Sequence, residues 1–529
     1  MTTPSNNSSL DASLTFLRKA YTGNKLTFNR GIEREALRVD PTGKLAQTPH
    51  PLFLGSKLTH PTITTDFSES QLELITPVAH SADEALTLLN DVHRFVYSGL
   101  KDEVLWSASM PCVLKDDPHI PLAQYGNSNL GRLKTTYRSG LSTRYGRAMQ
   151  TICAIHYNFS VDKSLWEHLA FLEKQTPDRH YRSKRYFDLM RNFRRLSWLP
   201  VYLFGASPAV CKSFVQGRQH QLHEFDAGSL YQENATSLRN GDLGYQSETQ
   251  AGMVKVCYNS LDNYVSTIAS AIGTPHEQYQ KLGVKKDDQY LQVSGNILQS
   301  EAEFYTTIRA KCVPPKGENF LKVLKADGVE YIEVRLLDVN PYLPLGIDAT
   351  QIHFLDALLM YCLLTNSPDH DDQLCASVSN NVRAVVYNGQ DTTTLVNDMG
   401  RDRSIKSWGT EVLDGVMQVA QWLDSVNGVD VYQRSVTVQQ AKVADAGLIP
   451  SARIIEDMRA DTKPFSRFAM DQSLVHKAEF QQQTLSPAEL SYFQELAAQS
   501  VRDHALIESQ PGPTFDAYLA SMLATYKEL

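Results

Sequence analysis

The chain has no apolar run long enough to cross a membrane, since a spanning helix needs about 18–20 consecutive apolar residues. The nearest candidate, FLDALLMYCLL, is short and contains Asp356, so it predicts a buried helix. The first residues, MTTPSNNSSLDAS, lack the basic segment and the apolar stretch of a secretory signal. From these absences we expect a cytoplasmic protein without a membrane partner.

Cysteine is scarce, with seven residues in the whole chain, and no two of them have the CxxC spacing. An odd and scattered set argues against a disulfide framework and fits a reducing compartment. The missing spacing also argues against a structural zinc site. We expect small buried side chains with free thiols. The seven are Cys112, Cys153, Cys211, Cys257, Cys312, Cys362 and Cys375.

The sequence also lacks an excess of positive charge: 51 Lys and Arg stand against 59 Asp and Glu, a formal net charge of −8. Nucleic-acid binders usually carry a strong basic surface, so we expect no nucleic-acid partner. No GxxxxGK[ST] motif is present, and no glycine-rich turn leads from a strand straight into a helix. A bound nucleotide would therefore not use a P-loop or a dinucleotide-binding crevice.

What the sequence does contain is enough apolar residues, 42%, for a large core. Strand-like patterns occur at 27–80, 151–161, 288–298 and 328–340. Helical spacing fills 82–105 and most of the chain after residue 350. Because strands and helices do not alternate as βαβ units, the pattern predicts an α+β fold, with an antiparallel sheet surrounded by helices.

The remaining segments give weaker signals. Residues 1–8 are polar and predict a frayed tail, after which Ser9 could cap a first helix. Residues 107–148 predict a long loop region with short helices. Residues 178–199 predict a basic helix that ends near Pro200 and turns its charges to solvent.

The most informative feature is a set of four strand-like motifs, each with at least one ionisable residue, and in three of them with two polar residues two positions apart: RGIEREALRV, SQLELITPV, AIHYNFSV and EYIEVRLLDV. In a strand, residues i and i+2 point to the same face. The polar face would hold Glu33, Glu35, Glu73, His156, Asn158, Glu333 and Arg335. The opposite face would hold Ile32, Leu72, Leu74, Ile155, Tyr157, Ile332 and Val334.

Carboxylates gathered at a partly buried site repel one another unless cations neutralise them. The predicted ligands are mostly oxygen, with one imidazole and no thiolate, which suits Mg²⁺ or Mn²⁺. A Mg²⁺ site of this kind is typical of phosphate chemistry. The pattern therefore predicts a divalent-cation site to which several strands contribute.

Each motif also has an ordinary interpretation. Glu33 and Glu35 flank Arg34 and lie close to Arg38, so they could instead form ion pairs on a solvated edge strand. The first motif alone does not decide between an edge strand and a metal site.

The other motifs leave similar alternatives. Asp66 is seven residues before Glu73, so only a turn or a bulge would bring both to one site, and Asp66 could otherwise be a cap. His156 could be a satisfied core histidine. Glu333 and Arg335 could be an ion pair within a strand, or a metal ligand beside an arginine that meets a phosphoryl group.

Three further stretches combine glycine, basic and aromatic residues and could hold a carboxylate or a phosphate, although solvated loops would look the same. The first, at 123–146, contains Arg132, Lys134, Arg138 and Arg144. The second, NATSLRNGDLGY, contains Arg239 and Tyr245. The third, EAEFYTTIRAK, contains Tyr305, Arg309 and Lys311.

Several long motifs, in order from Arg30 to Pro341, resemble those of the glutamate–cysteine ligase family of the γ-proteobacterial type. They are RGIEREALRV, TTDFSESQLELITPV, SMPC, LAQYGNSNLGRLKTTYRSGL, HYNFS, YLFGASPAVC, ATSLRNGDLGY and GVEYIEVRLLDVNP. The resemblance continues more weakly through FLDALL, LDSVNG and PSARI, and it is poor at 163–195, at 370–410 and after 465.

The resemblance implies a glutamine-synthetase-like fold, in which a curved antiparallel sheet forms an active-site funnel with helices outside. It implies a catalytic domain at 9–400 with a helical C-terminal region at 401–529 packed on it. The implied activity joins the γ-carboxylate of L-glutamate to the amine of L-cysteine through a γ-glutamyl phosphate, with ATP as co-substrate and Mg²⁺ as cofactor. This is the first step of glutathione biosynthesis.

The resemblance also implies roles for individual residues. The metal ligands would be Glu33, Glu35, Asp66, Glu73, His156 and Glu333. Arg335, beside Glu333, would face the transferring phosphoryl group. Substrate contacts would come from Arg138, Asn158, Arg239, Tyr245 and Tyr305, with the two tyrosines in the cysteine pocket. Arg309 and Lys311 would lie toward the nucleotide.

Other functions remain open at this stage. A related ligase could use a different amine, and a regulatory homologue could have lost catalysis on the same scaffold. A Mg²⁺-dependent nuclease is disfavoured by the net charge, and a bifunctional glutathione synthase would need more chain after residue 410 than is present. We expect a monomer whose partners are the three small-molecule substrates.

Overall fold

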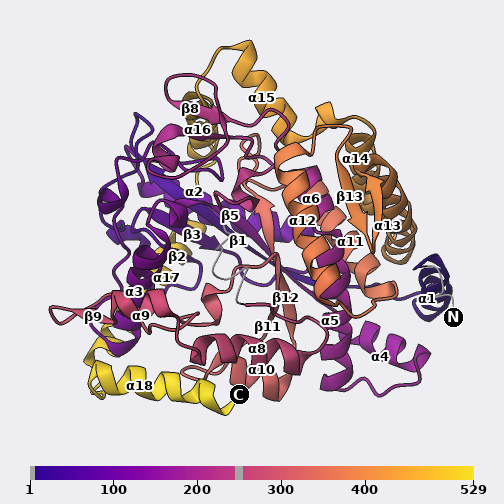
Figure 1. Cartoon of the computed structure of the whole chain (residues 1–529), viewed down its shortest axis with the longest axis horizontal. Helices are drawn as coiled ribbons and strands as arrows, with labels where there is room; N and C mark the ends of the chain where they lie inside the picture. The colour runs from indigo at the N-terminus through magenta and orange to yellow at the C-terminus, as the bar shows by residue number, and fades with distance from the viewer. Residues whose placement is uncertain (1–5, 245–253) are drawn as a thin grey trace.

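The computed structural model describes residues 6–244 and 254–529, and its centre is an open antiparallel sheet (Figure 1). The order of its strands is β11 (Ile308–Lys311), β12 (Tyr331–Asp338), β5 (Ala154–Val161), β1 (Phe28–Val39), β3 (Gln71–Ile75) and β2 (Ile63–Thr65). A seventh strand, β4 (Val104–Leu105), pairs with the far end of β1. Each of these pairings is antiparallel, so the predicted α+β class is confirmed.

Helices cover one face of this sheet and continue into a second layer (Figure 1). Those nearest the sheet are α2 (Ala82–Gly99), α5 (Arg179–Leu196), α6 (Trp198–Phe204) and α11 (Ala349–Leu364). Outside them lie α1 (Asn6–Ala20), α12 (Asp372–Asn388), α13 (Ile405–Asn427) and α14 (Val431–Ala444). Helix α11 contains the FLDALLMYCLL run and is buried almost all round, as predicted.

The remaining elements surround the sheet. They are α3 (Asn129–Tyr145), α4 (Lys163–Leu172), α8 (Leu261–Gly273), α9 (Glu277–Leu282), α10 (Phe320–Asp327), α15 (Pro450–Ala460), α16 (Phe465–Gln482), α17 (Pro487–Ser509) and α18 (Phe515–Thr525). The short strands are β6 (Ala209–Cys211), β7 (His223–Glu224), β8 (Ser229–Tyr231), β9 (Lys285–Lys286), β10 (Gln289–Tyr290), β13 (Leu395–Asp398) and β14 (Arg401–Ser404).

The helix-covered face of the sheet carries the apolar residues that the strand alternation predicted. Ile32, Leu72, Leu74, Ile155, Tyr157, Ile332 and Val334 all have no exposed surface. The same face of β1 also holds Arg30, whose guanidinium forms an ion pair of 2.6 Å with Asp356 of α11. The Tyr157 hydroxyl donates to the same carboxylate at 2.6 Å. One face of the sheet is therefore committed to the core, which leaves the other for the polar residues.

Several predicted elements differ in the structure. The first helix begins at Asn6, not at Ser9. The loop region 107–148 contains the long helix α3 rather than short helices only. Of the predicted strand 288–298, the structure forms only β10. The predicted domain division at residue 400 falls in the turn between β13 and β14, and it stays a prediction.

The basic helix predicted at 178–199 is not a solvated helix. Helix α5 ends at Leu196, and Pro200 lies inside the next helix, α6. Within α5, Arg191 and Asp188 are buried and form an ion pair of 2.5 Å. Arg191 also donates to backbone carbonyl groups of distant segments, so it is part of the core. The prediction was wrong because burial of this helix depends on contacts that its own sequence does not show.

The C-terminal helices α17 and α18 pack against α3 and the segments around it, at the lower left of Figure 1. Glu508 of α17 accepts hydrogen bonds from the backbone N–H groups of Asn127 and Ser128, at 2.9 and 2.7 Å. The Arg132 guanidinium lies over the ring of Phe515, 4.2 Å from its centroid. The C-terminal part is helical as predicted, and it fixes the start of α3.

No helix among residues 6–244 and 254–529 combines the length and the apolar character needed to cross a membrane. The seven cysteines all have free thiols in the structure. Five of them are buried, and Cys257 and Cys375 are half-buried. The expectation of mostly buried cysteine side chains is confirmed.

Candidate active site

The pairing of the strands brings the predicted polar residues to one face of the sheet. Glu35 is opposite Glu73 on β3, and Glu33 is opposite His156 on β5. Glu333 on β12 is opposite Asn158. Residues directly opposite in an antiparallel pair have neighbouring side chains on the same face. We call Glu33, Glu35, Asp66, Glu73 and Glu333, together with His156, the carboxylate cluster.

The tightest part of the carboxylate cluster is formed by Glu33, Glu73 and His156. One ligand atom from each of the three lies within 4.8 Å of the others. The His156 Nδ1 atom is 3.2 Å from Glu33, and its Nε2 atom is 3.6 Å from Glu35. Burial and the nearby Arg335 lower the pKa of His156 to about 4, so the imidazole is neutral, as a metal ligand must be.

The cluster is electrostatically strained when no cation is bound. Burial raises the pKa of Glu73 to about 8, with further contributions from the charges of Glu33 and Asp66. Burial, Asp66 and Glu73 raise the pKa of Glu35 well above its usual range. A divalent cation would remove this repulsion, and carboxylates together with an imidazole are suitable donors for Mg²⁺.

Asp66 reaches the cluster through a turn, as its spacing from Glu73 required. The chain reverses between β2 and β3, where the N–H of Asp66 donates to Gln71 at 3.1 Å and the N–H of Gln71 donates to Ser68 at 2.9 Å. Burial raises the pKa of the Asp66 carboxyl, although Arg138 and Arg335 oppose the shift. The turn thus adds a carboxylate from just after the end of β2 to the four strands that already contribute to the site.

Glu333 has a different environment, because two cations and the His156 imidazole lie close to it. Its Oε1 atom is 3.0 Å from Arg335, 3.5 Å from Lys311 and 3.8 Å from His156. Burial favours the neutral acid, but Arg335 and Lys311 hold the pKa of Glu333 well below its usual range. Its buried Oε2 atom has no hydrogen-bond partner within the described part of the chain. The ion pair therefore exists and still leaves one oxygen for a ligand.

The edge-strand interpretation of Glu33 and Glu35 is wrong. β1 is a central strand, and its arginines lie on the face opposite to the carboxylates. Arg34 contacts His93 at 2.5 Å, and Arg38 forms an ion pair of 2.5 Å with Glu103. Neither arginine therefore neutralises the carboxylate cluster.

The basic residues of the stretch at 123–146 divide between the site and the surrounding structure. Arg138 of α3 donates to the carbonyl oxygens of Asp66 and Thr65, so it lies beside the turn of the cluster. Arg144 is fully buried in an ion pair of 3.0 Å with Glu303, and Arg132 packs on Phe515. Only part of the predicted stretch is therefore near the carboxylates.

The other predicted binding residues lie around the same face. Arg239 is buried and donates to the carbonyl oxygen of Arg335 at 2.6 Å. Asn158 donates to Glu33 at 2.8 Å. Arg309 donates to the backbone carbonyls of Ala302, at 2.8 Å, and Phe304. These contacts hold the side chains at the edge of the site.

Two tyrosines were predicted for the cysteine pocket. The Tyr305 hydroxyl is 3.1 Å from the Gln150 amide, close to the N-terminal end of β11. Tyr245 lies outside the described residues.

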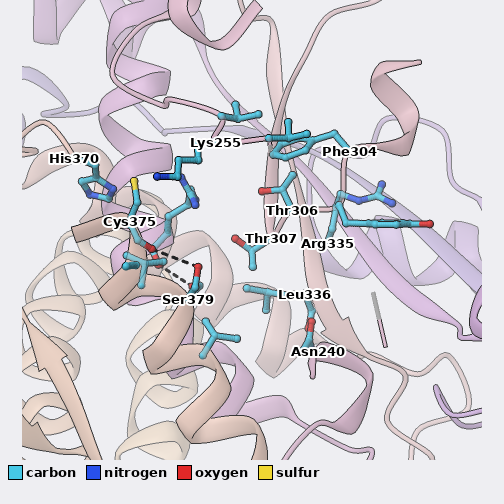
Figure 2. Close-up of a pocket in the computed structure, with 18 of the residues that line it drawn as sticks. Asn240, Lys255, Phe304, Thr306, Thr307, Arg335, Leu336, His370, Cys375 and Ser379 are labelled. Carbon is cyan, nitrogen blue, oxygen red and sulfur yellow. Dashed lines mark hydrogen bonds between the residues drawn. The ribbon is translucent and has the colours of Figure 1, made fainter. Parts of the chain in front are cut away.

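A cavity of about 540 Å³ opens beside the carboxylate cluster. From the sheet side it is lined by His156, Arg239, Tyr305 and Arg335, and by Leu336 and Phe304. Its opposite wall comes from α5, α12 and the segment at 254–257. Figure 2 shows His370, Cys375 and Ser379 on that wall, facing Thr306, Thr307 and Leu336 across the space.

The sequence did not indicate the opposite wall of the cavity. Arg194, Lys255 and His370 all line it. Arg194 belongs to the helix that was expected to face solvent, and its guanidinium lies 4.3 Å from the centroid of the Tyr258 ring. These residues carry no local motif, so only the tertiary structure places them near the site.

Comparison with known proteins gives consistent matches over most of the chain. The family model described as glutamate-cysteine ligase matches residues 14–385. A glutamate–cysteine ligase of Pseudomonas putida is 47% identical over 499 residues, which cover 93% of this chain and 95% of that protein. One from Alcanivorax borkumensis is 46% identical over 497 residues, covering 93% and 94%.

Two solved structures have a similar fold. The crystal structure of glutamate–cysteine ligase from Francisella tularensis in complex with AMP is 34% identical, with a TM-score of 0.90, and the match covers 95% of this chain and 99% of that one. A bifunctional glutathione synthetase from Pasteurella multocida is 22% identical, with a TM-score of 0.68 over 92% of this chain and 57% of that one. The second likeness concerns the fold alone.

Proposed function

Because the chain belongs to the glutamate–cysteine ligase family and joins L-glutamate to L-cysteine with ATP, giving γ-glutamylcysteine, we propose that the carboxylate cluster is where this reaction occurs. The observation that supports the location is the strand pairing, which sets Glu35 beside Glu73 and Glu33 beside His156. The cavity next to the cluster offers space for the amino acids.

A carboxylate is a poor electrophile, so the γ-carboxylate of glutamate is first phosphorylated by ATP, which leaves ADP. The cysteine amine then attacks the γ-glutamyl phosphate; the new C–N bond forms as the C–O bond to phosphate breaks. The departing phosphate can take the proton that the amine loses. Negative charge builds on the phosphoryl oxygens in the first step, and cations around them lower its barrier.

The residues of the cluster fit Mg²⁺, and Mn²⁺ takes the same donors. Two observations support a cation at this place: among the described residues the buried Oε2 atom of Glu333 has no hydrogen-bond partner, and the pKa of Glu73 is raised to about 8. When bound, Mg²⁺ supplies positive charge at the phosphoryl oxygens. The proposed ligands are Glu33, Glu35, Asp66, Glu73, His156 and Glu333.

The protein's own cations complete the site. Arg335 is held at 3.0 Å by Glu333 and is proposed to face the transferring phosphoryl group. Arg309 and Lys311, on the neighbouring strand β11, are proposed to contact the nucleotide. Arg239 would bind a substrate carboxylate from the cavity wall.

Three further residues have proposed substrate contacts. Arg138 would bind a carboxylate from its place beside the turn, and Asn158 would orient the substrate from β5. Tyr305 would line the cysteine pocket.

We also propose that the protein works as a monomer in the cytoplasm, without nucleic acid or a membrane as partner. The seven free thiols support a reducing compartment. The single chain contributes every proposed ligand, so the site needs no second subunit.

The decisive variant is Glu333→Gln, which removes a charge but keeps the volume. We expect turnover, measured as ADP release with glutamate, cysteine, ATP and Mg²⁺, to fall at least ~10³-fold, as when a key electrostatic group is lost. The matched control is Glu330→Gln, which changes an exposed residue three positions earlier and should leave the rate unchanged. Near-normal turnover of Glu333→Gln would show that Glu333 is not a required metal ligand.

The acceptor is tested separately with the wild-type protein. ADP release is measured with glutamate and a panel of amines that includes cysteine and alanine. We expect cysteine to be strongly preferred. Equal rates with alanine would favour a related ligase with another acceptor, and no turnover with any amine would favour a regulatory homologue.

A further inference from the structure

β12 contains an irregularity at the point where it passes the cavity. The pairing with β5 shifts register between Val334 and Leu337, so the two residues between them are not paired with β5. Their carbonyl groups accept hydrogen bonds from a different segment: Arg335 from the guanidinium of Arg239 at 2.6 Å, and Leu336 from the amide of Asn240 at 3.0 Å. The irregular strand is therefore joined to the short 3₁₀ segment Leu238–Asn240.

Asp338, at the end of the same strand, makes the second connection. Its carboxylate is 1% exposed and accepts from the Ala206 N–H at 2.8 Å, from the Ser207 hydroxyl at 2.6 Å and from the Ser237 hydroxyl at 3.0 Å. The Arg239 guanidinium lies 3.6 Å from it. A buried carboxylate with three donors and one cation is rigidly held, since each partner limits its rotation.

The arrangement explains how two arginines can share one wall of the cavity. Arg239 and Arg335 both line the cavity, and two guanidinium groups of the same charge disfavour each other. Asp338 places a negative charge next to Arg239 on the side of the core. Removing the Asp338 carboxylate would take away the negative charge 3.6 Å from the Arg239 guanidinium, so the direction of the Arg239 side chain depends in part on Asp338.

We propose that Asp338 is a positioning residue: it fixes the Arg239 guanidinium beside Arg335, so that the pair receives the carboxylate of an amino-acid substrate. This inference rests on the proposed function, which gives Arg239 a substrate-binding role. Asp338 does not itself reach the substrate in this arrangement; it acts through Arg239. Ser207 and Ser237 contribute by holding the carboxylate.

The test is Asp338→Asn, which keeps the shape and removes the charge. We expect the KM for glutamate or for cysteine to rise about tenfold or more, while the KM for ATP changes less than about twofold. A purely structural defect would lower the amount of active enzyme and would not raise one KM selectively. If all three KM values stay at the wild-type level, Asp338 is not a positioning residue.

Asp356→Asn is the matched control. Asp356 is also a fully buried carboxylate with an arginine partner, Arg30, but it lies on the helix-covered side of the sheet. We expect this variant to lose thermal stability with unchanged KM values. If the KM that rises in Asp338→Asn also rises in Asp356→Asn, the loss of any buried charge disturbs the site. That result would overturn the inference.

A double-mutant cycle with Arg239→Met separates this inference from the proposed function. If Asp338 acts through Arg239, Asp338→Asn adds no further KM increase once Arg239 is replaced. If Arg239→Met alone leaves both amino-acid KM values unchanged, the proposed role of Arg239 fails. If Arg239→Met raises a KM and Asp338→Asn does not, only the role of Asp338 fails.

Ser237→Ala provides a second variant if Asp338→Asn does not fold. It removes one donor to Asp338 and leaves the Asp338–Arg239 pair in place. We expect a smaller rise in the same amino-acid KM, with the KM for ATP unchanged. Wild-type values for every substrate in a folded Ser237→Ala, together with failure of Asp338→Asn to fold, would count against the inference.

Discussion

Replacing Glu73 by Gln should stabilise the metal-free protein, although the change removes a proposed metal ligand. Glu73 lies near Glu33 and Asp66, and its pKa is raised by burial and by these neighbours from 4.5 to about 8. At 1.36 kcal/mol per pKa unit, this shift sets an upper limit of roughly 5 kcal/mol for the penalty of the charged form. Because the neighbouring carboxylates share the repulsion, we expect about 2 kcal/mol of stabilisation.

The free energy of unfolding of the metal-free wild-type protein should fall as the pH rises. The folded protein binds the Glu73 proton more tightly than the unfolded chain does, so the stability that this proton confers is complete below pH 4.5. That stability is lost as the pH rises toward about 8. In the presence of EDTA, the wild-type protein should therefore lose stability between about pH 4.5 and pH 8, and Glu73→Gln should lose less.

Mg²⁺ should make the wild-type protein more stable than Glu73→Gln, the reverse of the order expected in EDTA. A cation bound only by the folded state stabilises it by about 2.7 kcal/mol at one hundred times its dissociation constant. The wild-type protein should gain this stabilisation, and Glu73→Gln should gain much less. The assay is the thermal or urea unfolding midpoint at pH 8.5, measured in EDTA and in excess MgCl₂.

Glu69→Gln is the control on the same hairpin. Glu69 forms an ion pair with Lys57 outside the carboxylate cluster, so this variant should be less stable than the wild type, and Mg²⁺ should not change the difference. The reasoning is refuted if Glu73→Gln is no more stable than the wild type in EDTA at pH 8.5. It is also refuted if Mg²⁺ stabilises both proteins equally.

Two further predictions concern packing. Gly131→Ala should destabilise the protein, because a Cβ at this position of α3 would overlap the carbonyl oxygen of Tyr125. Gly273→Ala in α8 places its Cβ in open space and should be neutral or stabilising by up to ~1 kcal/mol. The measurement is the unfolding midpoint of each variant, and equal midpoints for the two would contradict this packing. In a thiol titration without reductant, Cys257 and Cys375 should react first in the native protein and all seven thiols in denaturant; a total below seven would reveal a disulfide.

The strand periodicity was enough to predict which face of the sheet would carry the site. Glu33 and Glu35 are two apart, and so are Glu333 and Arg335, and this spacing alone determines that each pair shares a face. The register between strands was not available from the sequence, because it depends on which strands pair. The closeness of Glu35 to Glu73 follows from that register.

What the sequence could not show was determined by long-range contacts. The burial of Arg191 depends on Asp188 nearby and on carbonyl groups at Tyr258 and Ser367, far along the chain. Local charge therefore predicted a solvated helix where the fold has a buried one. For the same reason the sequence did not predict that Arg194 lines the cavity, since its position there depends on the packing of α5 against distant segments.

The link between Glu508 and the start of α3 has a consequence for how the protein is made. It joins residues 381 positions apart in the sequence. During synthesis, α3 leaves the ribosome long before the helices that cover it. Leu133 and Tyr137 pack with Phe515 and Leu519, so these two side chains stay exposed until α18 has been made. Contacts of such separation form slowly, because a long loop must close first. The nascent protein should thus depend on chaperones until α18 arrives, and it should acquire activity late.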